Sequence, residues 1–125
     1  MGLSVPQGGG KTTLCNCLEQ AMLVLDIKTG QISYDDLYKT HEELERLREQ
    51  NPDSIYYQGR GVAGTHDLEL GVTVLNEMIY SDTMEIPRYK KSLHNGKGDR
   101  LPQSQWTRMS GPLDLVLVEG WMLGF

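Results

Sequence analysis

The sequence predicts an α/β fold in which a parallel sheet carries helices on its faces. Three observations lead to this prediction. A short apolar segment at residues 2–5 is followed by a glycine-rich loop and then by a helical pattern. A second strand pattern, at residues 31–34, ends at two aspartates, and an apolar run at residues 113–118 stops at an acid. Short apolar runs bounded by turn residues are typical of buried parallel strands.

The glycine-rich loop at residues 6–13 predicts a phosphate-binding site. Glycines allow successive backbone N–H groups to turn toward one anion, and the helix that follows directs the positive end of its dipole to the same place. Lys11 can reach the β- and γ-phosphates of a nucleotide, and the Thr12 hydroxyl can bind Mg²⁺. The strict motif has glycine where this chain has Val5, and a glycine-rich turn before a Lys-Thr pair is the alternative interpretation. The residues assigned to the nucleotide are Pro6, Gln7, Gly8, Gly9, Gly10, Lys11, Thr12 and Thr13.

The helix after the loop is expected at residues 10–25 and should turn one apolar side toward the sheet. That side is expected to consist of Leu14, Leu18, Met22 and Leu25. Cys15 and Cys17 lie two residues apart on this helix, so their side chains point to different faces and do not form a zinc site by themselves. We interpret them as packed or exposed residues under reducing conditions, with a reactive thiol as the alternative.

Two more helices are expected in the middle of the chain. Thr40 and Glu43 form a capping box for a helix at residues 41–50, whose charges indicate a solvated face. A third helix should follow Asp67 and end near Tyr80. Its apolar stripe is expected to be Leu68, Val72, Leu75 and Ile79.

The segment between this helix and the final apolar run is harder to interpret. Residues 83–88 predict a strand. Residues 92–112 are rich in Gly, Asn, Asp, Ser and Pro without periodicity, and a loop of that length in a compact domain is usually functional. We therefore expect this loop to contribute to the site.

Composition limits the function classes. A length of 125 residues fits one domain, and 38% hydrophobic with 23% charged residues is typical of a globular chain. The formal net charge of −5 argues against nonspecific binding of nucleic acid, and no apolar run approaches the roughly 20 residues that span a bilayer. With no targeting segment before the first strand, we expect a cytoplasmic protein with a small-molecule substrate.

Acids at the ends of the predicted strands suggest phosphoryl transfer. The carboxyl ends of parallel strands meet at one edge of a sheet, so Asp35 and Glu119 should lie near the phosphate loop. Asp35 is interpreted as the base that activates a hydroxyl, and Glu119 as the acid on the metal side; Asp36 is a weaker candidate. For each, the alternative is an exposed strand-end carboxylate or a helix cap.

Cations and aromatic residues near the long loop could bind an anionic acceptor or the γ-phosphate. The cations are Arg88, Lys90, Lys91, Lys97 and Arg100. Tyr89 and Trp106 could line an acceptor pocket, although single aromatic residues more often serve packing.

Several blocks of the chain together resemble D-glycerate 3-kinase of the plant and fungal type, which is similar to the uridine kinase, pantothenate kinase and phosphoribulokinase group. The blocks are residues 6–13, 33–38, 60–68, 87–92, 96–100, 111–114 and 119–125. The resemblance implies a P-loop kinase that uses ATP and Mg²⁺ to convert D-glycerate into 3-phosphoglycerate. It implies the role of base for Asp35. The catalytic residues assigned in all are Lys11, Asp35 and Glu119, with Thr12 and Glu119 on the metal. The substrate-binding residues assigned within the blocks are Asp36, Tyr38, His66, Asp67, Arg88, Tyr89 and Arg100.

Three departures from the family pattern leave alternatives open. Val5 replaces a small residue in the loop, and Lys90 stands where relatives tend to have Asp or Asn, which could change the acceptor to another hydroxyl compound such as a nucleoside. Family members continue beyond the position of Phe125. Residues 1–125 are therefore expected to be the N-terminal part of a single P-loop kinase domain, apparently truncated before its last strands, adenine pocket and lid. A noncatalytic nucleotide-binding protein is a further alternative, and a plastid is the alternative compartment.

Overall fold

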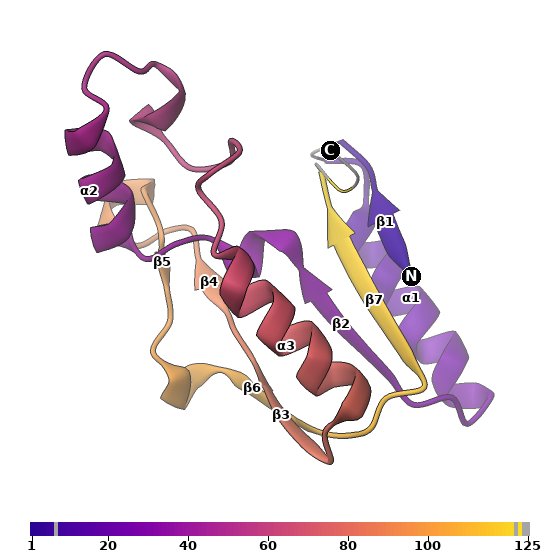
Figure 1. Cartoon of the computed structure of the whole chain (residues 1–125). Helices are drawn as coiled ribbons and strands as arrows, with labels where there is room; N and C mark the ends of the chain where they lie inside the picture. Colours follow the sequence, from indigo (N-terminus) through magenta and orange to yellow (C-terminus); the bar gives the residue numbers. More distant parts are fainter. Residues whose placement is uncertain (7, 122, 124–125) are drawn as a thin grey trace.

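The computed structural model describes residues 1–6, 8–121 and 123, and its centre is a parallel sheet of three strands. The strands are β1 (Gly2–Ser4), β2 (Thr29–Ser33) and β7 (Leu115–Gly120), in the order β1-β7-β2 (Figure 1). Strand β7 therefore pairs with both others, and Glu119 lies opposite Leu3 on one side and Ser33 on the other. The predicted α/β fold with a parallel sheet is confirmed.

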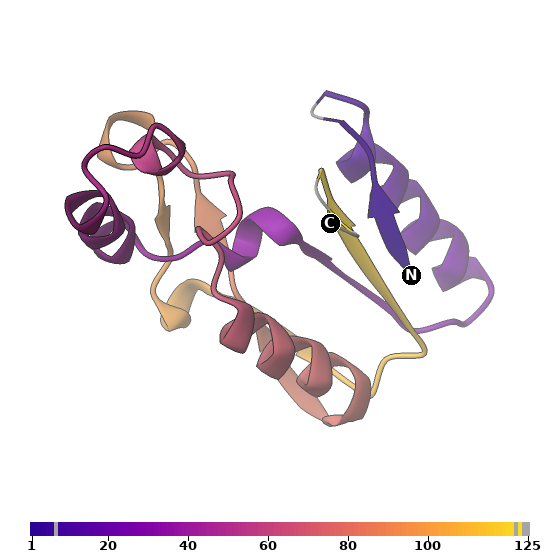
Figure 2. The ribbon, with the colours of Figure 1, turned by 45° about the horizontal axis from the view of Figure 1, so that its top comes forward.

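Helices α1 (Lys11–Val24) and α3 (Leu68–Tyr80) lie on opposite sides of this sheet (Figures 1 and 2). On the α3 side, Val116 and Val118 of β7 pack against the main apolar core. That core consists of Ile32, Leu37, Val74, Met78, Met84, Ile86 and Leu113. Side chains alternate between the faces of a strand, so Leu117 and Glu119 point to the α1 side.

The expected apolar face of α1 is wrong in part. Leu14 and Leu25 are 46% and 63% exposed, whereas Cys15 is fully buried. The inner face instead follows the spacing from Cys15 to Leu18 and Met22, which are all less exposed than Leu14. Because apolar residues occur on both sides of this helix, its sequence did not determine which side meets the sheet.

The expected stripe of α3 is confirmed only for Leu75, which packs against the core, and is wrong for its other three residues for a related reason. Leu68, Val72 and Ile79 are 65%, 62% and 45% exposed, and the buried residues are Gly71, Val74 and Met78. A β-carbon at Gly71 would lie 3.1 Å from Leu37 Cδ1, which is tighter than an ordinary contact. The helix therefore turns its glycine toward the core, where the missing side chain allows close approach.

A separate arm extends from the end of β2 (Figure 1). It begins with the short 3₁₀ helix η1 (Tyr34–Leu37), continues into α2 (His41–Gln50) and then forms η2 (Tyr56–Gln58). The predicted capping box is confirmed. The Thr40 N–H donates to Glu43 Oε2 at 2.8 Å, and the Glu43 N–H donates to Thr40 Oγ1 at 3.3 Å.

The segment after α3 contains more regular structure than expected. Strand β3 (Thr83–Ile86) pairs antiparallel with β6 (Thr107–Ser110), and β4 (Tyr89–Lys90) pairs with β5 (Asp99–Arg100). Two short 3₁₀ helices, η3 (His94–Gly96) and η4 (Gln103–Gln105), lie between these strands. The expectation of one irregular loop is therefore wrong for β5 and β6. Strand β3 stops before Pro87, which has no N–H to donate to a sheet.

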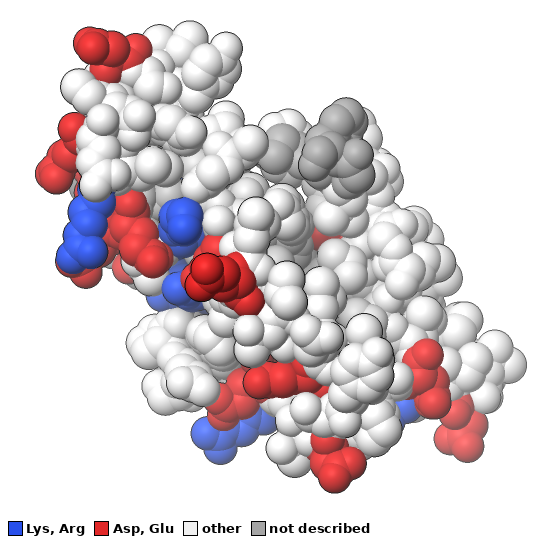
Figure 3. All heavy atoms as spheres, in the orientation of Figure 1, with Lys and Arg blue, Asp and Glu red and all other residues white. Residues whose placement is uncertain are grey.

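On the face seen in Figure 3, Lys and Arg side chains occupy a few spots and lie beside Asp and Glu. Uncharged atoms cover much of the remaining surface in that view. Among the described residues, no helix combines the length and apolar character that crossing a membrane requires.

Candidate functional site

The phosphate loop has the backbone conformation that its glycines suggested. Gly8 and Gly10 both have φ of 76°, a left-handed conformation that side chains disfavour. A β-carbon at Gly9 would lie 2.5 Å from Val5 Cγ1, so Val5 packs beneath the loop at a place where Gly9 leaves room for it. Val5 is thus compatible with the loop. Gln7 lies outside the described residues.

Helix α1 starts directly behind the loop with its first N–H groups available. Gly10 is its N-cap residue, and no side chain of the described part of the chain caps the helix. Uncapped N–H groups and the positive end of the helix dipole together favour an anion at this place. The Lys11 ammonium lies across the loop, donating to the carbonyls of Val5 at 2.9 Å and Pro6 at 3.0 Å.

The acids at the strand ends lie beside this loop. Glu119, near the end of β7, is 8% exposed, and Thr12 Oγ1 donates to its Oε1 at 3.4 Å. Asp35 lies in η1 and forms an ion pair of 2.5 Å with Lys91 Nζ. Together they line a cavity of about 660 Å³, the loop cavity. Its lining residues are Gly8, Gly10, Lys11, Thr12, Thr13, Ser33, Asp35, Asp36, Tyr89, Lys91, Glu119, Gly120 and Trp121.

This donor set suits Mg²⁺ bound together with a nucleotide. Among residues 1–6, 8–121 and 123, no group of three or more His, Cys, Asp or Glu side chains is placed to hold a metal ion. Mg²⁺ commonly takes only one or two protein oxygens and completes its shell with water and substrate phosphates. The Thr12 hydroxyl and the Glu119 carboxylate are two oxygen groups that lie side by side at the loop.

A second cavity, of about 730 Å³, adjoins the loop cavity. Asp35, Lys91 and Trp121 line both cavities, so they form the boundary between them. We call the second one the cationic cavity. Its remaining lining residues are Tyr38, Arg48, Gln58, Gly59, Arg60, Gly61, Val62, Asn95, Gly96 and Lys97.

The sequence interpretation missed two of these cations as site residues. Arg48 lies in α2, whose charges were interpreted as a solvated face. Arg60 lies within one of the matching blocks but received no role. The glycines on both sides of Arg60 were the available signal, because they indicate a tight backbone that presents one side chain. Predicted Lys97, by contrast, does line the cationic cavity.

Asp36 and Arg88, both assigned to the substrate, contact each other. Arg88 Nη1 lies 3.0 Å from Asp36 Oδ2, and the Tyr89 N–H donates to Oδ1 at 3.1 Å. The Ser33 N–H also donates to Asp36, which closes a capping box on η1. Burial raises the pKa of Asp36, although Arg88 and the backbone donors act against the rise. Asp36 and Tyr89 line the loop cavity, but the Asp36 carboxylate is already occupied by protein donors.

Asp67 and Arg100 form a second internal pair and line neither cavity. Asp67 accepts the Leu70 N–H at 3.0 Å and so caps α3, and its Oδ2 lies 2.9 Å from Arg100 Nη1. Burial alone would raise the pKa of Asp67, but the Leu70 N–H and the Arg100 guanidinium outweigh it and lower the pKa. The pair therefore links α3 to β5. The structure does not bring these two residues to either cavity, where contact with substrate was expected.

His66 is a buried aromatic residue at the base of the arm. Its ring stacks between Tyr34 and Tyr38, with centroid distances of 4.0 and 4.4 Å. The side chain is 4% exposed, its Nε2 has no hydrogen-bond partner among the described residues, and burial lowers its pKa to about 4. Tyr38 does line the cationic cavity, and burial together with the Asp35 charge raises its pKa. His66 therefore stacks on the ring of Tyr38 and helps to fix its position, and the His66 ring itself lines neither cavity.

Lys90 and Trp106 lie away from both cavities. Lys90 is exposed on β4 opposite Asp99, so the charge that suggested another acceptor does not line the site. Trp106 Nε1 donates to the Leu101 carbonyl at 2.8 Å, which anchors the ring to its own chain segment. Of the two cysteines, Cys15 is buried and Cys17 is exposed, in accord with their predicted opposite faces.

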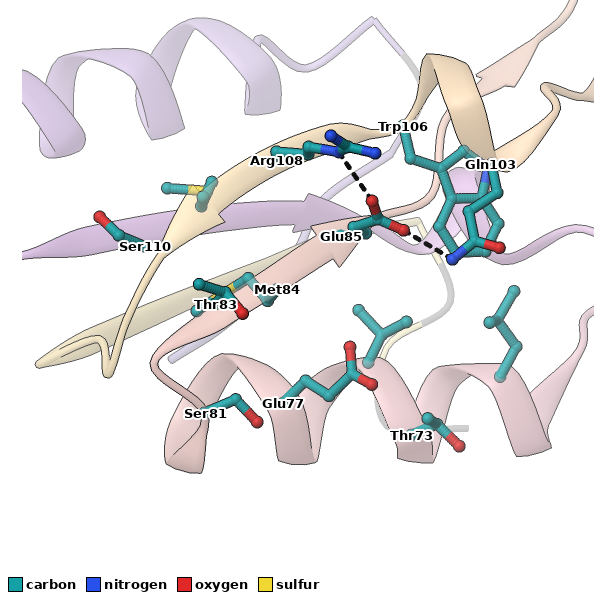
Figure 4. Close-up of a pocket in the computed structure, with 13 residues that line it drawn as sticks. Thr73, Glu77, Ser81, Thr83, Met84, Glu85, Gln103, Trp106, Arg108 and Ser110 are labelled. Atoms are coloured by element: carbon teal, nitrogen blue, oxygen red, sulfur yellow. Dashed lines mark hydrogen bonds and ion pairs between the residues drawn. The ribbon is translucent and has the colours of Figure 1, made fainter.

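The largest cavity, of about 910 Å³, lies between α3 and the β3–β6 pair and contains no residue of the phosphate loop (Figure 4). Glu85 lies at its centre, where it accepts from Gln103 at 2.6 Å and from Arg108 at 2.8 Å. These two donors lower the pKa of Glu85. Since Glu85 and Arg108 pair with each other and no phosphate-binding residue lines this cavity, we place the chemistry at the loop cavity despite the smaller volume.

Comparisons with curated proteins agree with the motifs. No protein-family model matches the chain. It is 43% identical over 129 residues to chloroplastic D-glycerate 3-kinase of Arabidopsis thaliana, and this match covers 100% of the chain and 28% of the relative. It is 40% identical to the uncharacterized kinase mug58 of Schizosaccharomyces pombe, covering 100% of the chain and 46% of that protein. The chain thus spans less than half the length of these curated relatives.

Solved structures extend the likeness to the fold. The structure of the YGR205w protein matches with a TM-score of 0.88 at 38% identity, covering 99% of this chain and 45% of that one. D-glycerate 3-kinase from Cryptococcus neoformans matches with a TM-score of 0.85 at 37% identity, covering 99% and 42%. A possible uridine kinase from Bacillus stearothermophilus, 20% identical, shares the fold with a TM-score of 0.62. The resemblance to D-glycerate 3-kinase and the P-loop kinase fold are confirmed.

Proposed function

We propose that this chain, which resembles D-glycerate 3-kinase along its whole length, supplies the phosphate loop and the acceptor side of an ATP-dependent kinase that converts D-glycerate into 3-phosphoglycerate. One observation carries the proposal. The Asp35 carboxylate lines both the loop cavity and the cationic cavity. A base in this position can accept a proton from a hydroxyl in one cavity while the phosphoryl donor lies in the other. The likeness to the D-glycerate 3-kinase of Arabidopsis supports the choice of acceptor.

In this proposal residues 1–125 are the N-terminal part of one P-loop kinase domain. The chain covers 28% of the Arabidopsis relative and 46% of the fission-yeast relative, so the complete reaction belongs to the whole protein. The described residues supply the phosphate loop, the candidate base and an acceptor cavity. We assign the adenine pocket and a lid that excludes water to further parts of the domain.

On the donor side, the proposed ligand is ATP with Mg²⁺. The left-handed glycines and the uncapped start of α1 offer backbone N–H groups to the phosphates. Lys11 would exchange its carbonyl contacts for the β- and γ-phosphate oxygens, which are stronger partners for an ammonium group. Thr12 and Glu119 would hold Mg²⁺, whose charge stabilises the phosphates during transfer.

On the acceptor side, Asp35 is the proposed base and Lys91 its partner. Their ion pair of 2.5 Å lies on the boundary between the two cavities. The hydroxyl oxygen of the acceptor would attack the γ-phosphorus, its proton would pass to Asp35, and the bond to the β-phosphate oxygen would break to release ADP. Lys91 can then move toward the charge on the transferring phosphoryl group, since its side chain is 57% exposed and free to rearrange.

The test uses the whole protein and follows phosphoryl transfer by phosphorus NMR with MgATP and D-glycerate. We expect the 3-phosphoglycerate resonance with the unmodified protein, and its loss in Lys11→Ala and Asp35→Asn. Asp35→Asn should retain MgATP affinity, because Asp35 does not hold the phosphates in this scheme, whereas Lys11→Ala should lose it. MgATP bound without any transfer to D-glycerate would overturn the proposal.

The same experiment distinguishes the alternatives. A nucleoside offered beside D-glycerate tests the second acceptor class. That class was suggested by Lys90, which lines neither the loop cavity nor the cationic cavity. Preferential phosphorylation of the nucleoside would establish that class instead. Nucleotide binding with no transfer to any acceptor would indicate a noncatalytic binding protein.

For the compartment, we propose the cytoplasm. The Arabidopsis relative is chloroplastic, which supports a plastid as the alternative. Fluorescence imaging of the protein tagged at its carboxyl end distinguishes the two.

A further inference from the structure

The four cations of the cationic cavity differ in whether a carboxylate pairs with them. Lys91 pairs with Asp35 at 2.5 Å, Lys97 pairs with Glu45 at 2.9 Å, and Arg48 pairs with the same glutamate. Arg60 has no carboxylate within ion-pair distance in the described part of the chain. One guanidinium in the cavity wall therefore carries a positive charge that no described acid balances.

Arg60 is nevertheless held in a fixed position. Its Nη1 donates to the carbonyls of Gly96 at 2.8 Å and Lys97 at 2.5 Å. Its guanidinium carbon lies 5.7 Å from the centre of the Tyr89 ring, within the range of a cation–π contact. These contacts use one of the three guanidinium nitrogens, so Nε and Nη2 keep their hydrogens for another acceptor.

The turn that holds Arg60 has an unusual backbone conformation. His94, Asn95 and Gly96 have φ of 50°, 55° and 87°, so three consecutive residues are left-handed. Left-handed conformations of residues other than glycine are costly and persist where surrounding contacts require them. Here the turn directs two neighbouring carbonyls toward the same guanidinium nitrogen.

We propose that Arg60 is the specificity residue that binds the carboxylate of the acceptor, an inference that rests on the proposed kinase function. A guanidinium with two free donor nitrogens matches the two oxygens of a carboxylate. Asp35 lines the same cavity and defines the place of the reacting hydroxyl. The acceptor class is therefore a small hydroxy acid, whose carboxylate is held at Arg60 and whose hydroxyl is activated at Asp35.

The other cavity cations serve this site less well. Lys97 and Arg48 share Glu45, and their contacts hold the pKa of that glutamate down, to about 2. Each of them is therefore engaged by a carboxylate, although one glutamate cannot neutralise both charges. A neutral acceptor such as glycerol offers no partner for Arg60, so the site should discriminate against it by the energy of one charge-assisted contact.

The experiment compares Arg60→Met with Arg46→Met. Methionine keeps an apolar stem beside Tyr89 while removing the charge, and Arg46 is a matched control because it pairs with Glu42 on the solvent side of α2 and is 65% exposed. The kcat/KM is measured for D-glycerate and for glycerol, which has the hydroxyls without the carboxylate. A lost contact to a charged group costs about 1.5–3 kcal/mol, or roughly 10- to 150-fold.

We expect Arg60→Met to lower kcat/KM for D-glycerate by that factor, with glycerol and the KM for MgATP unchanged within about threefold. Arg60→Lys should recover part of the loss, since lysine restores the positive charge but not the planar guanidinium with two donor nitrogens. Equal losses for both acceptors, or no loss, would overturn the role of Arg60.

D-glycerate binding is also measured directly by NMR, in the absence of turnover. Binding that weakens in Arg60→Met but not in Arg46→Met supports the site even if the kinase proposal fails, and binding that is the same in all three proteins refutes it.

Discussion

The buried ring of His66 should make the protein sensitive to mild acid. Burial lowers its pKa from 6.5 to about 4, so between these values the unfolded chain binds a proton that the folded chain does not. The unfolded state is therefore favoured as the pH falls through this window. Linkage over the two pKa values gives a loss of about 2.5 kcal/mol between about pH 7.5 and about pH 4.5.

The perturbation is His66→Phe. Phenylalanine preserves an aromatic ring between Tyr34 and Tyr38 and removes the buried Nε2 that lacks a partner. The loss of stability that His66 causes as the pH falls should therefore be absent from this variant over the same pH window. Asp36 acts in the opposite direction, because its folded pKa is raised, but it is present in both proteins and cancels from their difference.

The assay is urea unfolding followed by circular dichroism at several pH values, with the His66→Phe protein beside its parent. The slope of stability against pH is compared rather than the absolute stability, because phenylalanine also changes packing. The NMR titration of the His66 ring in the folded protein should have its midpoint at about pH 4. Identical pH slopes in the two proteins, or a midpoint at the ordinary histidine value, would refute the reasoning.

Three other predictions concern the loop, an ion pair and a helix cap. Gly9→Ala should weaken MgATP binding by roughly 5- to 150-fold, equivalent to about 1–3 kcal/mol of overpacking against Val5, and Val5→Gly should recover much of this in the double variant; calorimetry of all four proteins measures the coupling. Arg100→Met should destabilise the fold by about 2 kcal/mol near neutral pH. Because the folded pKa of Asp67 is lowered, its contribution is present above the unfolded value of 3.8 and lost below it, so the acid loss of stability in urea should become shallower in this variant. Thr40→Ala should cost about 1 kcal/mol in thermal unfolding, and an unchanged melting temperature would contradict the observed cap.

Local signals sufficed where the structure depends on neighbours in sequence. The capping box at Thr40 and the helix it begins depend on contacts three residues apart, and residues 41–50 are helical as predicted. The strand–loop–helix order around the phosphate loop was likewise readable, because glycine positions restrict the backbone directly. These elements place the loop at the end of the sheet.

Other features depend on partners that are distant in sequence. Strand β6 exists because β3 pairs with it across residues 87–106, and no local pattern in Thr107–Ser110 predicts this pairing. The faces of α1 and α3 could not be assigned because each helix has apolar residues on more than one side. For Asp67 and Arg100 the difficulty is chemical. A carboxylate and a guanidinium in the blocks that resemble the family are equally suited to bind a ligand or each other.

The strand order means that the phosphate loop gains its supporting strand late in folding. Strand β7 lies between β1 and β2, so residues 2–4 find no strand partner within the described sheet until residues 118–120 are available. Contacts between such distant residues form slowly, because a long loop must close first. During synthesis the loop would leave the ribosome early but remain without its supporting strand until nearly the last of these residues had followed. The nucleotide should therefore bind only after the sheet has closed, and its binding reports completion of this part of the fold.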